Sequence, residues 1–176
     1  TAWRAGVEPE FWVNKEGAFW NTFHSTVPRP TSISETEFAV FKQNLTFLKM
    51  AQVTESGDSY GQITASLPVG AEAEGLAHIW NITWVRDQAY AAVALARAGK
   101  LDEARAALEF TLQGKAGGYT EQVGQDYGLS VCRLYGDGSE WSDDDGTGPN
   151  IELDNFGLTL WAIGVYVDAG GDSDIW

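Results

Sequence analysis

The sequence predicts an all-α protein with about four or five helices, joined by long loops and short extended segments. Two stretches, 84–98 and 156–167, are apolar on nearly every side when placed on a helix, and such helices are buried among others. A third stretch, 34–53, begins with a helix-start signal and continues with an apolar stripe. A chain of 176 residues that is 44% hydrophobic can bury these elements in a core.

Residues 1–31 form the first of two predicted regions, an aromatic-rich lead-in segment whose apolar residues follow no clear period. Pro28 and Pro30 close this segment. We expect it to pack across other elements, and we expect region 32–176 to hold the helices. The aromatic residues of the lead-in are Trp3, Phe11, Trp12, Phe19, Trp20 and Phe23.

The first predicted helix begins with a capping box formed by Ser34 and Glu37. In this motif the serine side chain bonds a backbone N–H of the first turn, and the glutamate reaches back to the serine. The helix is expected to run to about Val53. Its apolar stripe consists of Phe38, Phe41, Leu45 and Leu48.

The middle of the chain predicts an extended segment followed by a helical hairpin. Residues 60–66 alternate loosely between polar and apolar side chains, which is typical of a short strand. The helix 84–98 is expected to stop at Gly99, because glycine adopts the left-handed backbone that ends helices. A second helix, 102–113, follows so closely that the two form an αα-hairpin.

The C-terminal third predicts one extended stretch, 131–135, and one long helix. That helix begins around Glu152 to Asp154 and continues to about Val167. It therefore opens with carboxylates, as the helix 84–98 does. If the two helices run parallel, their acidic ends face one rim.

The composition excludes some partners. Eleven Lys and Arg against twenty-five Asp and Glu give a formal net charge of −14. This balance opposes binding to nucleic acid, whose affinity comes mainly from phosphate contacts, and to an anionic membrane. No apolar run is long enough for a transmembrane helix. A neutral ligand is the expected partner, without metal or cofactor. Cys132 is the single cysteine and is expected to be a small buried residue.

The candidate binding residues are Trp84, Arg86 and Asp87, at the mouth of the buried helix 84–98. The helix dipole favours the Asp87 carboxylate near the helix start. Arg86 offers a fork of donors and Trp84 a flat apolar face. These groups suit a sugar ring, which has hydroxyls on its rim and C–H groups on its faces. The alternative is a helix start with a local Arg86–Asp87 ion pair and no ligand.

An acidic, glycine-rich stretch, 136–146, raises the question of calcium. Its carboxylates do not follow the spacing of an EF-hand loop, and a solvated loop is the favoured interpretation. Trp141 within this stretch is a candidate ligand-facing aromatic.

The residues Trp84-Val85-Arg86-Asp87 resemble the Trp-x-Arg-Asp motif of glucoamylase-type glycoside hydrolases of family 15. Residues 148–157, Gly-Pro-Asn-Ile-Glu-Leu-Asp-Asn-Phe-Gly, resemble the segment before a later inner helix of that family. Residues 61–66 are similar to the extended segment that precedes the motif. The three segments agree in order and spacing, and the resemblance covers residues 35 to 170.

The resemblance implies an (α/α)6 barrel of six inner and six outer helices. It also implies an inverting, exo-acting hydrolase that releases glucose from the chain ends of an α-glucan. Arg86 and Asp87 would bind hydroxyls of the terminal glucose, and Trp84 would line the same subsite. Trp141 would lie near the next sugar and Asp154 would support the pocket rim.

The same resemblance assigns no catalytic residue to this chain. In the family, the general acid and general base are glutamates that follow all the segments matched here. The chain is therefore expected to be the N-terminal part of a larger catalytic domain, inactive alone, with the remainder of the parent polypeptide as its partner. A secreted or periplasmic bacterial enzyme is slightly favoured. The alternatives are a non-catalytic carbohydrate-binding relative and a helical interaction module.

Overall fold

The computed structural model describes residues 8–66, 81–144 and 146–175. The chain forms two compact units, residues 1–46 and residues 47–176. The boundary between these units falls inside helix α2, Glu35–Ala51.

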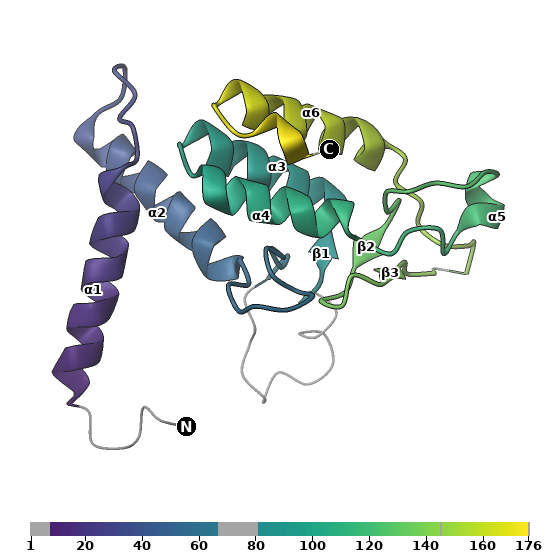
Figure 1. Cartoon of the computed structure of the whole chain (residues 1–176), viewed down its shortest axis with the longest axis horizontal. Helices are drawn as coiled ribbons and strands as arrows, with labels where there is room; N and C mark the ends of the chain where they lie inside the picture. The colour runs from purple at the N-terminus through teal and green to yellow at the C-terminus, as the bar shows by residue number, and fades with distance from the viewer. Residues whose placement is uncertain (1–7, 67–80, 145, 176) are drawn as a thin grey trace. The chain divides into compact units, whose positions relative to one another are not determined.

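The first unit contains helix α1, Pro9–Ser25, in the stretch for which the sequence showed no regular period (Figure 1). Pro9 occupies the first turn, where proline's fixed backbone and missing N–H are well suited to a helix. Along α1 only Phe23 is buried, so the helix has no continuous apolar stripe to detect. Trp3 lies outside the described residues.

Helix α2 confirms the capping box. Backbone N–H and Oγ of Ser34 both donate to Oε2 of Glu37, at 2.8 and 2.7 Å, and the Glu37 backbone N–H donates to Oγ of Ser34 at 3.3 Å. These bonds satisfy backbone donors that a helix start leaves without partners. The helix begins where the motif predicts.

Three helices form the core of the second unit: α3, Val85–Arg97, α4, Leu101–Leu112, and α6, Asp154–Asp168. Gly99, with a φ of 73°, makes the tight turn between α3 and α4, as predicted. Helix α3 packs against both α4 and α6 (Figure 1). The side chains of Leu95, Leu108 and Ile163, one from each helix, are fully buried.

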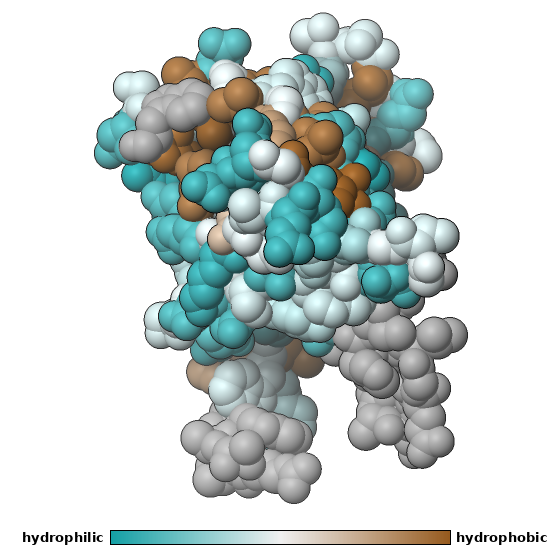
Figure 2. Space-filling view, turned by 90° about the vertical axis from the view of Figure 1, so that its right-hand side faces the viewer, coloured by the Kyte–Doolittle hydropathy of each residue, from teal (hydrophilic) through white to brown (hydrophobic). Residues whose placement is uncertain are grey.

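Helix α6 is less buried than its sequence indicated. Leu160 and Trp161 are 55% and 39% exposed, because α6 packs mainly on α3, with a smaller contact on α4. Tyr90 of α3 contacts the Trp161 ring edge-on, with centroids 5.6 Å apart. The face of the molecule in Figure 2 likewise shows apolar patches between polar ones.

A small antiparallel sheet covers one end of the helices. Its strands are β1, Thr83–Trp84, β2, Arg133–Leu134, and β3, Glu140–Trp141, in that order. The extended stretch expected at 131–135 is thus confirmed in part, but β1 and β3 were not predicted. Trp84 ends β1 and is also the N-cap residue of α3, so the helix begins where the sequence predicts.

The segment 60–66 is not a strand of this sheet. It makes one isolated bridge, between Gln52 and Ile63. Gln88 of α3 holds it in place: its Oε1 accepts the Ile63 backbone N–H at 2.8 Å, and its Nε2 donates to the Ala107 carbonyl at 2.8 Å. The segment therefore lies across the α3–α4 hairpin.

Two short helices, α5, Thr120–Val123, and the 3-10 turn Ser173–Ile175, complete the described elements. Helices dominate the described residues, so the all-α prediction is confirmed at that level. Within the same residues no helix combines the length and apolarity required to cross a bilayer.

Candidate functional site

A groove of ≈ 800 Å³ lies beside the first turns of α3 in the second unit. Trp84, Arg86 and Asp87, which the sequence singled out together, all line it, and Glu152 lines it from the segment before α6. Trp141 and Asp154 are outside its lining. The remaining lining residues are Phe47, Leu48, Ala51, Ile63, Thr64, Ala65, Ser66, Tyr90, Ala91 and Ala94.

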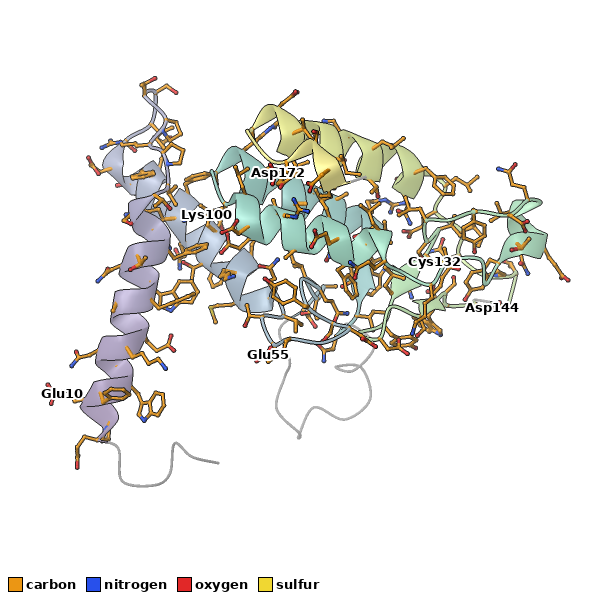
Figure 3. All side chains as sticks on the ribbon, in the orientation of Figure 1. Glu10, Glu55, Lys100, Cys132, Asp144 and Asp172 are labelled. Atoms are coloured by element: carbon orange, nitrogen blue, oxygen red, sulfur yellow. The ribbon has the colours of Figure 1, made fainter. Side chains whose placement is uncertain are left out.

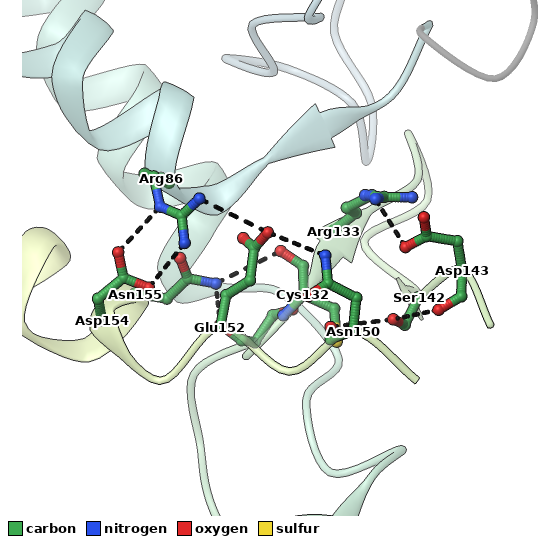
Figure 4. Close-up of polar contacts among 10 residues, drawn as sticks. Arg86, Cys132, Arg133, Ser142, Asp143, Asn150, Glu152, Asp154 and Asn155 are labelled. Carbon is green, nitrogen blue, oxygen red and sulfur yellow. Dashed lines mark hydrogen bonds and ion pairs between the residues drawn. The ribbon is translucent and has the colours of Figure 1, made fainter. Parts of the chain in front are cut away.

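Arg86 is bound by a carboxylate that lies 68 residues away in the sequence. Its Nε and Nη2 donate to Oδ2 and Oδ1 of Asp154, both at 2.9 Å (Figure 4). These two bonds raise the pKa of Arg86 and lower the pKa of Asp154. The acidic start of α6 therefore does meet the start of α3. Two of the donor groups of Arg86, however, are used inside the protein.

Glu152 is the buried member of the cluster, with its side chain 9% exposed. Its Oε1 lies 3.7 Å from Nη1 of Arg86 and accepts a hydrogen bond from Nδ2 of Asn150 at 3.3 Å. Its Oε2 is buried and has no hydrogen-bond partner among the described residues. Burial raises the pKa of Glu152, and the charges of Arg86 and Arg133 oppose that rise.

Asp87 is exposed in the first turn of α3. It makes no ion pair or side-chain hydrogen bond with the described residues, so the local Arg86–Asp87 pair considered from the sequence does not form. A helix N-terminus stabilises a carboxylate by its dipole without needing a contact. The Asp87 carboxylate is thus held at the groove by the helix while its oxygens remain available to a ligand.

Trp84 and Trp141 are connected by a residue that the sequence did not single out. Arg133 is paired directly with Trp84 on one side and with Trp141 on the other in the sheet register. Its guanidinium carbon lies 4.3 Å from the Trp84 ring centroid and 5.1 Å from that of Trp141. Its Nη2 also pairs with Oδ1 of Asp143 at 2.7 Å. A charged residue inside the apolar run 131–135 was the available signal.

A network of buried polar groups supports this end of the fold. Nδ2 of Asn155 donates to the carbonyls of Ser130 and Cys132, at 3.3 and 3.4 Å, and Sγ of Cys132 donates to the Asn150 carbonyl at 3.1 Å (Figure 4). Burial raises the pKa of the Cys132 thiol to about 11. A thiol held in its neutral form is a poor nucleophile, which agrees with a buried structural cysteine.

Two carboxylates of the acidic stretch accept hydrogen bonds from residues that follow them closely in the sequence. Asp137 accepts from the N–H and hydroxyl of Ser139, and Oδ1 of Asp144 accepts from the N–H groups of Gly146 and Gly148. Cys132 and Asp144 both lie toward the loop-rich end of this unit (Figure 3). The described part of the chain contains no group of three or more His, Cys, Asp or Glu side chains arranged to hold a metal ion.

Comparison of the chain with protein-family models, with curated proteins and with solved structures finds no match in any of the three.

Proposed function

We propose that the groove is a sugar-binding subsite of a glucoamylase-like, inverting and exo-acting α-glucoside hydrolase, which releases glucose from chain ends. The observation that carries the proposal is the convergence of Trp84, Arg86 and Asp87 with Glu152 on one groove. The motif resemblance independently names the first three of these residues.

The chemistry of the lining suits a pyranose ring. Asp87 supplies carboxylate oxygens that accept from sugar hydroxyls, and such charge-assisted bonds are the stronger kind. Arg86 is fixed by Asp154, which reduces the entropy lost when its remaining Nη1 donors meet a ligand. The ring of Trp84 provides an apolar surface for sugar C–H groups.

The proposal gives no catalytic role to the described carboxyls. Inverting hydrolysis requires a general acid and a general base about 6.5–9.5 Å apart, with space for a water between them. Asp154 and Glu152 are instead both engaged by Arg86, which lowers the pKa of Asp154 and opposes the rise that burial gives to the pKa of Glu152. The family resemblance assigns both roles to later glutamates, so the proposed partner is the remainder of a longer polypeptide in an (α/α)6 barrel.

A binding experiment tests the subsite. We expect the full chain to bind glucose, maltose and maltotriose in calorimetry, and Asp87→Ala to weaken this binding about tenfold, because it removes a charged acceptor of a sugar hydroxyl. Asp102→Ala is the matched control, since Asp102 is an exposed carboxylate in the first turn of α4. Absence of binding, or equal losses in the two variants, would overturn the proposal.

Catalysis is measured separately on the intact parent polypeptide. Inversion at an α-glucosidic bond gives β-glucose, which proton NMR distinguishes from the α-anomer during the first turnovers. Release of β-glucose from maltotriose supports the hydrolase. Sugar binding without any release supports the second candidate, a carbohydrate-binding relative without catalysis.

A further inference from the structure

The groove and the charged residues next to it carry more negative charge than positive charge. Arg86 lies between Asp154 and Glu152, and Asp87 follows it in the helix. The nearest second cation, Arg133, is itself paired with Asp143. Two arginines therefore face four carboxylates. The helix starts of α3 and α6 together contribute about one positive charge, which leaves about one negative charge uncompensated.

The surplus charge is located at two lining residues. Asp87 has no ion pair or side-chain hydrogen bond with the described residues, and Oε2 of Glu152 is buried without a hydrogen-bond partner among them. A buried oxygen of this kind has lost its water without gaining a donor, which costs free energy. A positive group that enters the groove offsets this free-energy cost more fully than a neutral hydroxyl does.

We propose that the groove binds a sugar carrying an ammonium group more tightly than the neutral sugar of the same size. The proposal rests on the sugar-binding function above and specifies its ligand class. The ammonium group lies between the carboxylates of Asp87 and Glu152, while Trp84 contacts the ring. Tyr90, which also lines the groove, adds a second aromatic surface that attracts cations.

Long-range electrostatics act in the same direction. The formal net charge of the chain is −14, so its field attracts cationic ligands and repels anionic ones. The field is screened by salt over about 10 Å at ~0.1 M ionic strength. The preference for an ammonium sugar is therefore expected to decrease as salt is added, whereas binding of the neutral sugar stays nearly constant.

Calorimetry with matched sugars tests the proposal on the full chain. The probes are glucose, 2-amino-2-deoxyglucose, 6-amino-6-deoxyglucose and N-acetylglucosamine, at about pH 6, where the amines are protonated. We expect at least one amino sugar to bind about fivefold more tightly than glucose, as an ion pair of intermediate exposure provides. N-acetylglucosamine, which fills similar space without charge, is expected to show no such gain. Equal affinities for glucose and both amino sugars would overturn the proposal.

Substitutions of the two groove carboxylates test whether they cause the preference for the ammonium sugar. Asp87→Asn keeps the shape of the side chain and is expected to remove most of the preference, and Glu152→Gln to reduce it. Asp102→Asn, at an exposed carboxylate in the first turn of α4, is expected to preserve it. Since Asp87 is exposed, Asp87→Asn remains informative if Glu152→Gln does not fold. A preference that survives in Asp87→Asn at full size would contradict the assignment.

The two proposals fail differently. If glucose binds and amino sugars bind no better, the sugar site stands and the charge preference is wrong. If amino sugars bind and no neutral sugar or maltooligosaccharide does, the groove does not bind a neutral glucoside, and the charge preference stands. If no sugar binds, both are wrong.

Discussion

The guanidinium of Arg133 lies 4.3 Å from the centre of the Trp84 ring, with the Trp141 ring on its other side at 5.1 Å. The side chain is 8% exposed, and Asp143 binds it at 2.7 Å. Sheet register explains the arrangement, because directly paired residues of neighbouring strands place their side chains on the same face. Trp84, which lines the groove, is thus held in place by the guanidinium of Arg133, which is not part of the groove lining.

Arg133→Met is expected to reduce the free energy of unfolding by about 2 kcal/mol, because it removes a desolvated cation–π stack and an ion pair at once. Urea denaturation followed by tryptophan fluorescence measures the change. Arg133→Lys keeps the charge but loses the flat fork, so we expect an intermediate loss. Asp143→Asn, at an exposed partner, is expected to cost less than either. Unchanged stability of Arg133→Met would show that the stack contributes nothing.

Features that depend on neighbours in the sequence were predictable. Ser34 and Glu37 are three residues apart, so the capping box and the start of α2 could be read directly. Gly99 marked the turn of the αα-hairpin for the same reason. The helices α3, α4 and α6 also followed from their apolar residues, because a helical period is a local pattern.

Features that depend on distant residues were not predictable from the chain alone. The Arg86–Asp154 pair joins residues 68 apart, and sequence favoured the adjacent Asp87 as a partner or co-ligand. Strands of two residues, such as β1 and β3, are too short to show alternation. Arg133 therefore remained unnoticed, because its position between two tryptophans exists only once those strands pair.

Gln88→Leu is expected to destabilise the second unit by about 3 kcal/mol. Gln88 is 1% exposed, and its amide bonds the Ile63 N–H and the Ala107 carbonyl. Leucine has similar volume but leaves the Ile63 N–H buried without its partner, at about 1–3 kcal/mol. It also removes one hydrogen bond to the Ala107 carbonyl, about 1 kcal/mol, although that carbonyl still accepts from Oγ1 of Thr111. Thermal unfolding measures the loss. Gln122→Leu, at an exposed site in α5, is the control and is expected to change stability by less than about 0.5 kcal/mol.

Gly61→Ala is expected to cost about 3 kcal/mol or more, because two effects coincide. The backbone of Gly61 has a φ of 88°, and an added Cβ lies 2.0 Å from the Ala106 carbonyl oxygen. Gly57→Ala is the matched control: its φ is 142°, with nothing within 4 Å of an added Cβ. It therefore isolates the backbone strain, about 1–2 kcal/mol. Equal losses in chemical denaturation would show that the close approach to α4 is unimportant.

The Glu152 carboxyl is expected to give stability a pH dependence of unusual sign. Burial raises its pKa above the ordinary value of 4.5, although Arg86 and Arg133 oppose the rise and Asp154 adds to it. The folded state then binds this proton more tightly than the unfolded state does. Stability consequently falls as pH rises from the unfolded pKa through the folded pKa. Asp154 has the opposite sign, since its pKa is lowered from 3.8 and its contribution is lost as pH falls through the folded value.

Glu152→Gln isolates the first of these effects. The amide does not titrate, so the stability of the variant relative to the original chain is expected to rise with pH in the window just above 4.5 and to level off beyond the folded pKa. Asp154→Asn should instead lose stability relative to the original chain as pH rises through the acid range near and below 3.8. Urea unfolding over a pH series measures both. A Glu152→Gln difference that is constant with pH would mean that this carboxyl is solvated in the folded protein, and the uncompensated oxygen at the groove would then not exist.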